Sequence, residues 1–448
     1  MSALEDATVL PVMASRPLAA SLSASPQVET FGCRLNMLES DGVRQAAAEA
    51  GLDNILVINS CAVTSEAVRQ ARQAIRRAKR DNPDLRVVVT GCAAQTEPET
   101  FARMAEVDLV IGNGAKTQFE TWRDVRHSLG AAGPDFGLSA ELRVRVQDIS
   151  DVREATPHLA DRFEGHTRAF VEVQNGCDHR CTFCIIPYGR GPSRSVPMGA
   201  VVKQVRRLVE AGHHEVVLTG VDLTSYGEGL PGTPRLGQLV RTVLRLVPEL
   251  QRLRLSSIDA IEADDDLLTA LAEEERLMPH LHLSLQAGDD LVLKRMKRRH
   301  SRKQALDFVA DLRNRRPDLV LGADIIAGFP TETEIQFRNT LAFVEEAGLA
   351  FLHVFPYSPR TGTPAARMPQ VPSGEISTRA RRLREMGQHL LLRHLAAEVG
   401  QQRNVLVEAN GRGHTEHFTP VRLLREVPRG TLARLRITGH DGVRLIAA

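Results

Sequence analysis

Three cysteines in the amino-terminal quarter of the chain each end an apolar, β-rich run, and this repeat constrains the fold more than any other feature. The runs QVETFGC, NILVINSC and LRVVVTGC end at Cys33, Cys61 and Cys92. A segment with helical spacing follows each cysteine, and a fourth apolar run, VDLVIG, occupies residues 107–112. A strand followed by a helix, repeated at roughly 30 residues, is the length of a parallel βα unit. The sequence therefore predicts an open parallel sheet over residues 27–130.

The same repeat predicts where the three thiols lie. In an open parallel sheet the carboxyl ends of all strands face one edge, and ligands bind there. Cys33, Cys61 and Cys92 would therefore meet at one place although they are far apart in the sequence. A single buried cysteine is a common small core residue. Three at the same point of successive units favour a metal or cluster site over packing alone.

The remaining three cysteines lie close together in the stretch QNGCDHRCTFCIIPYGRGPSR. Cys177, Cys181 and Cys184 have the spacing C-x3-C-x2-C. Structural zinc normally takes four protein ligands, and His179 is too close to Cys177 for the usual spacing of a fourth one. A 4Fe–4S cluster is normally held by four thiolates. Three thiolates would leave one iron open to a substrate or cofactor, so the sequence predicts two such open clusters.

The spacing of the second set, with Phe183 before its last cysteine, resembles the signature of the radical S-adenosylmethionine superfamily. Joined to the preceding three-cysteine domain, it resembles the methylthiotransferase family. The resemblance runs along almost the whole chain after residue 26, through TFGCRLNMLESD, VVTGCAAQ, VVLTGVDLTSYG, GADIIAGFPTETEIQF and VLVEANGRGHTEHFTPVRL. It implies S-adenosylmethionine and two 4Fe–4S clusters as cofactors, the clusters being held by Cys33, Cys61 and Cys92 and by Cys177, Cys181 and Cys184.

Strand and helix patterns alternate again over residues 166–374. Six β-rich runs there resemble the incomplete (β/α)6 barrel of the superfamily, in which the chemistry lies at the carboxyl ends of the strands. Residues near those ends, together with the aromatic residue of the cysteine loop, are the expected contacts of S-adenosylmethionine: Phe183, Gly220, Asp222, Ser256, Ser284, Gln286, Asp324 and Gly328. Ordinary strand-to-loop punctuation is the alternative interpretation of each small or polar residue taken singly.

The other segments complete an α/β protein of several domains. Residues 1–26 are rich in Ala, Ser and Pro and are expected to form a disordered tail. Residues 131–165 are expected to be a linker, and residues 375–399 a helical connector. Beyond that connector, short β-like runs separated by Gly, Pro and His predict a small antiparallel β-barrel over residues 400–448. This barrel is similar to the TRAM-like RNA-binding domain of the family.

Composition is that of a soluble globular protein, with 42% hydrophobic and 25% charged residues and a net charge of only +2. Attraction to nucleic acid would therefore come from local patches. Two basic runs, RQARQAIRRAKR and KRMKRRHSRK, and the arginine-rich carboxyl-terminal segment are the candidates. Each is either a solvated face or a set of phosphate contacts. No apolar run approaches the length of a membrane helix.

The resemblance implies methylthiolation of C2 of N6-threonylcarbamoyladenosine at position 37 of tRNA, because TFGCRLN and GHTEHFTPV look most like that branch of the family. Isopentenyladenosine in tRNA and an aspartate of a ribosomal protein are the other acceptors. A zinc-stabilised RNA-binding protein and a two-cluster electron carrier are the non-enzymatic alternatives. The expected partners are tRNA, a low-potential electron donor and a sulfur source, and the chain is expected to be a cytoplasmic monomer without a membrane partner.

Overall fold

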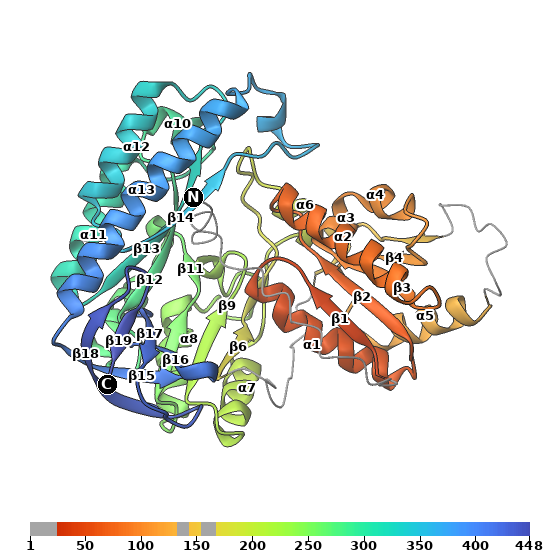
Figure 1. Ribbon diagram of the computed structural model, residues 1–448, viewed down its shortest axis with the longest axis horizontal. Helices are drawn as coiled ribbons and strands as arrows, with labels where there is room; N and C mark the ends of the chain where they lie inside the picture. The colour runs from red at the N-terminus through yellow and green to blue at the C-terminus, as the bar shows by residue number, and fades with distance from the viewer. Residues whose placement is uncertain (1–24, 132–142, 154–166) are drawn as a thin grey trace. The chain divides into compact units, whose positions relative to one another are not determined.

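The computed structural model describes residues 25–131, 143–153 and 167–448, which form two compact units (Figure 1). The first unit contains the described residues up to 153, together with Asn175–Arg180 and Cys184–Arg194. The second unit contains the rest of the described chain, including Cys181–Phe183. The loop that carries the clustered cysteines thus contributes residues to both units.

A parallel sheet of five strands, in the order β1-β2-β3-β4-β5, forms the first unit. The predicted parallel sheet is confirmed, and a short fifth strand extends it beyond the four predicted ones. The strands are β1 (Gln27–Thr30), β2 (Ile55–Ser60), β3 (Arg86–Gly91), β4 (Leu109–Ile111) and β5 (Val144–Arg145). The helices are α1 (Arg34–Glu49), α2 (Ser65–Asp81), α3 (Cys92–Thr96), α4 (Pro98–Ala102) and α5 (Phe119–Ala131).

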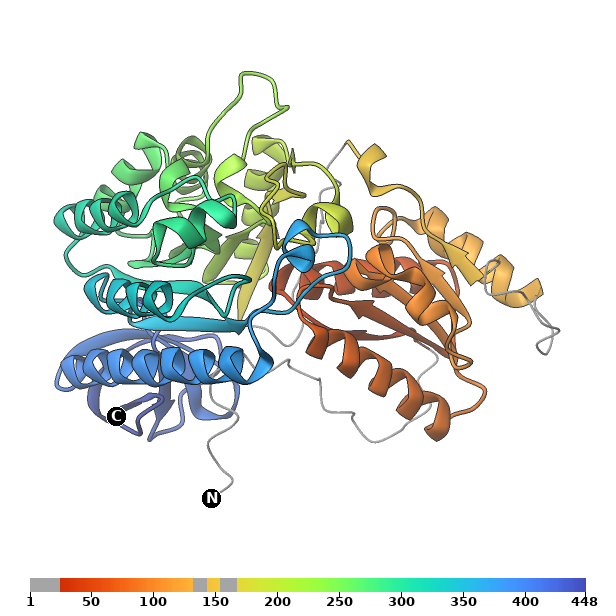
Figure 2. The same ribbon diagram turned by 90° about the horizontal axis from the view of Figure 1, so that it is seen from above.

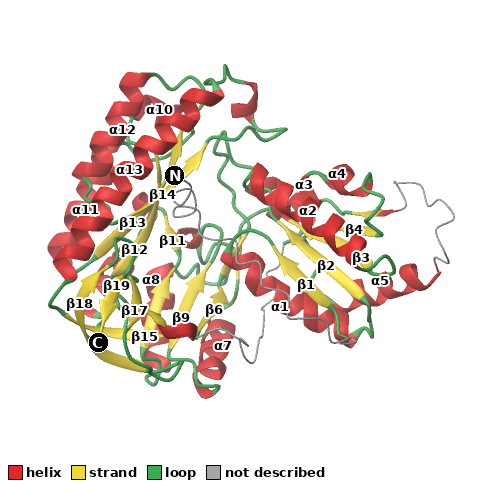
Figure 3. Cartoon of the chain, viewed as in Figure 1, coloured by secondary structure: helices red, strands yellow, loops and turns green. Residues whose placement is uncertain are grey.

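Helices cover both faces of this sheet (Figure 3). Alternate residues of β2 are buried on opposite faces. Leu56 and Ile58 pack in the cluster that includes α2, α3 and α4, whereas Ile55 and Val57 pack in the cluster that includes α1 and α5. A strand buried on both faces has no polar alternation, which explains the unbroken apolar runs before the cysteines. The two helical layers therefore fix the strand ends at which these cysteines lie.

Six parallel strand positions form the barrel of the second unit, which confirms the predicted barrel. One sheet has the order β10-β9-β6 and the other β11-β12-β13-β14, and only Ser256 separates β10 from β11. The strands are β6 (Arg168–Glu172), β9 (Glu215–Thr219), β10 (Arg252–Leu255), β11 (Ser257–Ile258), β12 (His280–Gln286), β13 (Val320–Ala327) and β14 (Phe351–Pro356). The helices between them are α7 (Met198–Glu210), α8 (Leu236–Leu246), α9 (Asp265–Glu273), α10 (Asp290–Arg295), α11 (Arg302–Arg315) and α12 (Glu334–Glu346).

The last five strands close into a small barrel in the order β15-β16-β17-β19-β18. They are β15 (Gln402–Val407), β16 (Arg412–His414), β17 (Pro420–Leu423), β18 (Leu432–His440) and β19 (Leu445–Ala447). The predicted barrel is confirmed, with one parallel pair, β17 and β19, among antiparallel ones. Helix α13 (Ser373–Glu398) packs against β14 and β18 and so joins the two barrels (Figure 2). None of the described helices is long and apolar enough to cross a membrane.

Buried charges tie the small barrel to the larger one within the second unit. Glu215 on β9 is fully buried and pairs with Arg168 at 3.2 Å and Arg254 at 2.9 Å. Arg254 also donates to the backbone oxygen of Thr415 at 2.8 Å. The guanidinium groups of both arginines lie over the ring of Phe418, at 4.8 and 5.1 Å from its centroid. Because breaking a buried pair leaves an uncompensated charge, these contacts hold the small barrel at a fixed position on the larger one.

Candidate active site

The three cysteines of the first unit lie at the carboxyl ends of neighbouring strands. Cys33 is the N-cap residue of α1 after β1, Cys61 directly follows β2, and Cys92 begins α3 directly after β3. Cys61 and Cys92 are buried, whereas Cys33 is exposed. Cys33 and Cys92 both lie close enough to Cys61 to raise the pKa of its thiol. The structure thus brings together three thiols that are far apart in the sequence.

Glycines directly before two of these cysteines make the close packing possible. Gly32 has a φ of +110°, and a Cβ on it would lie 2.8 Å from Sγ of Cys61. Gly91 has a φ of +93°, and a Cβ there would lie 2.3 Å from the backbone oxygen of Ser60. Glycine adopts these backbone conformations without steric cost, and other residues do not. Gly32 and Gly91 are therefore required by the geometry of the site.

Burial makes the thiols of Cys61 and Cys92 poor acids. Burial, together with Cys33 and Cys92, raises the pKa of Cys61 to about 12. Burial also raises the pKa of Cys92, although Arg190 and Lys116 act in the opposite direction. A metal that binds these thiols must displace their protons. Convergent thiols beside buried cations are a donor set that suits an iron–sulfur cluster, so the residues fit the group that the family uses.

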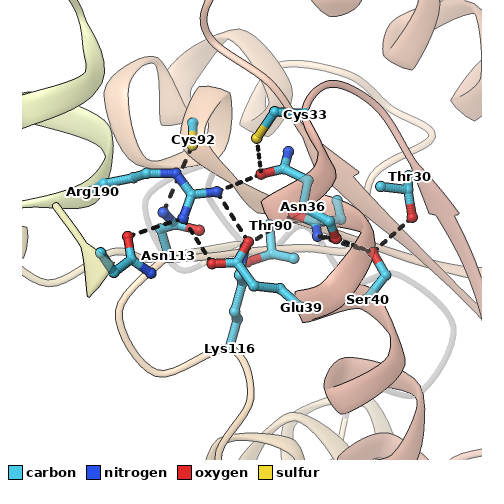
Figure 4. A network of polar contacts seen from close by, with 12 residues as sticks. Thr30, Cys33, Asn36, Glu39, Ser40, Thr90, Cys92, Asn113, Lys116 and Arg190 are labelled. Atoms are coloured by element: carbon cyan, nitrogen blue, oxygen red, sulfur yellow. Dashed lines mark hydrogen bonds and ion pairs between the residues drawn. The ribbon is translucent and has the colours of Figure 1, made fainter. Parts of the chain in front are cut away.

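A network of buried polar side chains lies beside the thiols of Cys33 and Cys92 (Figure 4). Arg190 is at its centre and donates to the carboxylate of Glu39 at 2.8 and 3.1 Å and to Oδ1 of Asn36 at 2.6 Å. Lys116 donates to the same carboxylate of Glu39 at 2.6 Å. Sequence reasoning missed these residues, because Arg190 lies 151 positions from Glu39 and no local pattern links them.

Two asparagines connect this network to the thiols. Oδ1 of Asn36 lies 3.8 Å from Sγ of Cys33. Nδ2 of Asn113 lies 3.8 Å from Sγ of Cys92 and donates to the backbone oxygen of Gly189 at 2.7 Å. A Cβ on Gly189 would lie only 3.2 Å from that of Cys92. Helix α6 (Ile186–Arg190), which follows the clustered cysteines in the chain, therefore packs directly on the first cysteine site.

The loop with the clustered cysteines is shaped by tight backbone contacts. Gly176 has a φ of +74°, and a Cβ on it would lie 1.9 Å from the backbone oxygen of Pro192. The backbone N–H of Cys177 donates to the oxygen of Gly191 at 3.1 Å. Cys177, like Cys181, Cys184 and His179, is only partly buried. In contrast to Cys61 and Cys92, these cysteines remain accessible to a small molecule.

A buried arginine lies beside Cys181 in the second unit. Nη1 of Arg298 is 3.8 Å from Sγ of Cys181, and Nη2 donates to Asp259 and to the backbone oxygen of Ser284, both at 2.6 Å. Burial alone would lower the pKa of Arg298, but Asp259 and Cys181 raise it. Arg298 belongs to the basic run at 294–303. Because its side chain is buried beside Cys181, it contacts the cysteine loop and does not form part of an exposed phosphate-binding surface. Other basic residues of the run pair with carboxylates: Arg299, Arg302 and Lys303.

Phe183 anchors the cysteine loop on the barrel. Its ring meets that of Phe329 edge-on, with 6.5 Å between the centroids, and packs in the cluster that contains Tyr357. The neighbouring Thr182 donates its N–H to the backbone oxygen of Met296 at 3.0 Å. This packing accounts for an aromatic residue before the last cysteine. A direct contact between Phe183 and the cofactor stays a prediction.

The end of β9 makes a turn in which Gly220 and Asp222 have structural partners. Oε1 of Gln174 accepts from the backbone N–H of Asp222 at 2.8 Å, and a Cβ on Gly220 would lie 2.9 Å from the same oxygen. The carboxylate of Asp222 accepts from the hydroxyl of Ser225 at 2.8 Å. These bonds explain the residue types at the turn. Contacts of Gly220 and Asp222 with the cofactor stay predictions.

Ser256, between β10 and β11, points to a polar ligand. Its side chain is buried, yet its hydroxyl has no hydrogen-bond partner among the described residues. Buried hydroxyl groups in native proteins are normally paired. The predicted neighbours Ser284 and Gln286 are partly buried on β12, and the hydroxyl of Ser284 lies 3.3 Å from that of Ser257. This polar set fits hydrogen bonding to S-adenosylmethionine.

Asp324 and Gly328 on and after β13 have partners that sequence reasoning missed. Oδ1 of Asp324 lies 2.8 Å from Nε2 of His282 and 3.3 Å from Nδ1 of His353. Burial would raise the pKa of Asp324, but the two histidines hold it well below its ordinary value. Gly328 has a φ of +74°, and a Cβ there would lie 2.6 Å from Ile376 of α13. Their contacts with the cofactor also stay predictions.

Two family models match the chain. The model described as the radical SAM superfamily matches residues 171–344, which include most of the large barrel. The model of the uncharacterized protein family UPF0004 matches residues 26–112, which carry the first three cysteines. Each matched segment thus contains one of the two sets of cysteines.

Curated relatives match nearly the whole chain. The threonylcarbamoyladenosine tRNA methylthiotransferase MtaB of Rickettsia prowazekii is 50% identical over 93% of this chain and 95% of its own length. MtaB of Bacillus subtilis is 38% identical over 77% of this chain and 76% of its own length. A tRNA-2-methylthio-N(6)-dimethylallyladenosine synthase of Cereibacter sphaeroides is 34% identical over 92% of this chain and 95% of its own length.

A solved structure shares the fold at low identity. The radical S-adenosylmethionine methyltransferase TsrM from Kitasatospora setae, with cobalamin and a [4Fe-4S] cluster bound, has a TM-score of 0.52 and 15% identity. The match covers 74% of this chain and 70% of that chain. The barrel, the superfamily match and the near full-length relatives agree, and this chain belongs to the radical S-adenosylmethionine methylthiotransferase family, whose members use S-adenosylmethionine and two 4Fe–4S clusters.

Proposed function

We propose that this protein is a tRNA methylthiotransferase that replaces the hydrogen on C2 of N6-threonylcarbamoyladenosine 37 by a methylthio group. The observation that supports it most is the 50% identity to MtaB of Rickettsia prowazekii over 93% of the chain. The dimethylallyladenosine synthase of Cereibacter sphaeroides covers a similar share, 92%, at only 34% identity. This difference favours threonylcarbamoyladenosine over isopentenyladenosine, and neither a ribosomal-protein aspartate nor a non-enzymatic role is favoured.

In this proposal the two cysteine sites have different tasks. Cys177, Cys181 and Cys184 hold the cluster that binds S-adenosylmethionine, and the first three cysteines hold the auxiliary cluster. When bound, these groups supply a 5′-deoxyadenosyl radical and a methylated sulfur. The C2–H bond would break, with the hydrogen atom leaving on 5′-deoxyadenosine, and a C2–S bond would form as the bond that holds the sulfur at the auxiliary site breaks. The methyl group of that sulfur would come from a second S-adenosylmethionine. The protein orients the acceptor base and keeps water away from it.

The side chains of the large barrel orient the cofactor. The buried hydroxyl of Ser256, which has no partner among the described residues, and the side chains of Ser284 and Gln286 would form hydrogen bonds with the cofactor at the strand ends. Arg298 holds the loop at Cys181 through its bonds to the backbone of Ser284 and to Asp259. Since these groups are fixed by the barrel, they are in place before the cofactor binds.

Exposed arginines of the small barrel support tRNA as the partner. Arg412 on β16 and Arg422 on β17 are cross-strand neighbours, and both are exposed. Like charges opposite each other in a sheet destabilise it, so an anionic partner bound at this pair would offset their repulsion. Further exposed arginines lie on or near the same barrel: Arg425, Arg429, Arg434 and Arg436. We further propose that the protein acts as a cytoplasmic monomer, with a low-potential electron donor and a sulfur source.

Mass spectrometry of tRNA nucleosides tests the substrate. Cells that lack this gene are expected to lose 2-methylthio-N6-threonylcarbamoyladenosine and to keep N6-threonylcarbamoyladenosine. Expression of the intact gene should restore the product, whereas the Cys181→Ala variant should not. Loss of the methylthio group from isopentenyladenosine instead would overturn the assignment of substrate while leaving the reaction class intact.

A further inference from the structure

The polar network behind the first cysteine site carries more positive than negative charge. Arg190 and Lys116 are two buried cations, with side chains 1% and 2% exposed. Glu39, 4% exposed, is the one carboxylate that pairs with them among the described residues. Burying a charge without a counter-charge is costly. An excess of one positive charge at this depth therefore calls for a nearby negative group.

The other partners of the two cations are neutral. Arg190 also donates to Oδ1 of Asn36 at 2.6 Å and to Oδ1 of Asn175 at 3.2 Å. Lys116 also donates to Oδ1 of Asn59 at 3.1 Å. These amides satisfy hydrogen bonds but supply no net charge. A thiolate-bound cluster at the edge of the same network would supply the compensating negative charge.

Short contacts link Arg190 to the cysteines. Oδ1 of Asn36, which accepts from Arg190 at 2.6 Å, lies 3.8 Å from Sγ of Cys33. Gly189, which precedes Arg190 in α6, lies so close to Cys92 that a Cβ on it would be 3.2 Å from Cβ of Cys92. Figure 4 shows the guanidinium of Arg190 near the side chains of Cys33 and Cys92. The excess positive charge therefore acts at the position of the sulfur ligands.

We propose that Arg190 and Lys116, moderated by Glu39, are a fixed counter-charge that sets the reduction potential of the iron–sulfur cluster held by Cys33, Cys61 and Cys92. The inference rests on the proposed ligand role of these cysteines. Adding an electron makes a thiolate-bound cluster more negative, and net charge and hydrogen bonds to the sulfurs are the protein's means of setting its potential. The buried cations stabilise the reduced form in a site where water screens little.

Arg190 gives this device a further consequence. It ends α6, which begins two residues after Cys184. The same short segment thus carries a ligand of the proposed radical-generating cluster and the main counter-charge of the auxiliary one. Arg190 is a positioning residue. Its replacement should change the reduction potential of the auxiliary cluster, because it removes a charge near the cluster but no thiol from either set of cysteines.

Redox titration of the full chain tests the proposal. The protein is reconstituted anaerobically in a background in which Cys177, Cys181 and Cys184 are changed to Ala, so that the auxiliary cluster alone gives the signal. Its potential is measured by titration with electron paramagnetic resonance detection. We expect Arg190→Gln and Lys116→Met to shift the potential to more negative values. Glu39→Gln should shift it to more positive values, and Arg190→Lys, which keeps the charge, should remain near the parent.

Lys79→Met is the matched control. Lys79 pairs at 3.3 Å with Asp108, which precedes β4 and so lies at the opposite edge of the sheet from the cysteines. Loss of this cation should leave the potential unchanged. Shifts of one sign in both Arg190→Gln and Glu39→Gln, or no shift in either, would overturn the proposal and leave the network a purely structural role. A parent protein that binds no iron would overturn the proposed ligand assignment itself.

Discussion

The two cysteine sites of this protein use the same ligand but are built in opposite ways. The first is assembled by the fold, from the ends of β1, β2 and β3, and two of its three thiols are buried. The second is contained in one short stretch of chain and is partly exposed throughout. Each has a buried arginine, Arg190 or Arg298, within the reach of its thiols. The difference lies in how much of the protein is needed to place the sulfurs.

This difference predicts which substitutions each site should tolerate. A site spread over three strands depends on every close contact between them, including glycines that leave no space for a side chain. A site formed by one short stretch of chain depends on the spacing of its cysteines and on the surface to which its loop is anchored. We expect the first site to lose its cluster when the packing between the strands is disturbed. The second site should lose its cluster when a cysteine is removed or when its loop is no longer anchored.

The largest effect separates the roles of the two sites. Cys181→Ala removes a ligand of the radical-generating cluster and should abolish cleavage of S-adenosylmethionine. Cys61→Ala removes a ligand of the auxiliary cluster and should retain some cleavage but yield no methylthio product. Both are measured as 5′-deoxyadenosine and modified nucleoside formed by the reduced protein. Methylthio product from Cys61→Ala would contradict this division.

The next effect tests whether packing builds the first site. Gly32→Ala should lose iron from the auxiliary site, because a Cβ at a φ of +110° would lie 2.5 Å from Cβ of Cys61. The left-handed conformation alone costs a non-glycine residue roughly 1–2 kcal/mol. Iron analysis and cleavage of S-adenosylmethionine are the measurements. Gly199→Ala, where a Cβ would meet nothing within 4 Å, is the control and should keep all its iron.

Anchoring of the second site should show a more moderate effect. Phe183→Ala removes a ring that packs on Phe329 in the cluster that contains Tyr357, and it should lower the free energy of unfolding by about 3 kcal/mol. Urea unfolding of the full chain measures the loss, and Phe183→Leu should recover most of it. Auxiliary iron should be unchanged. If Phe183→Ala emptied the first site as well, the two sites would not be independent.

The smallest effect concerns pH and the loop after β13. Burial raises the pKa of Glu332 to about 7, against the opposing effect of Arg379. Its favourable contribution is complete below the unfolded pKa near 4.5 and is lost as pH rises through the folded value. Relative to Glu332→Gln, the wild-type protein should therefore lose on the order of 2 kcal/mol of stability between pH 5 and about pH 7.5. Parallel pH curves for the two proteins would contradict this sign.

Much of the fold was predictable because it depends on local pattern. Runs buried on both faces predict β2 and β3, and the cysteine directly after each run predicts the edge at which the thiols meet. Strand β5 was missed because its two residues, Val144 and Arg145, carry no period. The single parallel pair in the small barrel was missed because chain order alone does not determine it.

The supporting residues of the sites could not be predicted, since their partners come from distant parts of the chain. Arg190 meets Glu39 from 151 positions away, and Arg298 lies in a basic run that favoured a nucleic-acid surface. Asp324 was expected to contact the cofactor, and its two histidine partners, His282 and His353, lie on neighbouring strands. Only the folded chain places these side chains together.

Iron and acid-labile sulfide analysis of one variant tests the two-site account most directly. The variant replaces Cys33, Cys61 and Cys92 by Ala in the full chain and is compared with the wild type after anaerobic reconstitution. We predict that it retains about half of the wild-type iron, as expected for one cluster of two, and still cleaves S-adenosylmethionine. Undiminished iron, complete loss of iron, or zinc bound in its place would contradict the existence of two separately built cluster sites.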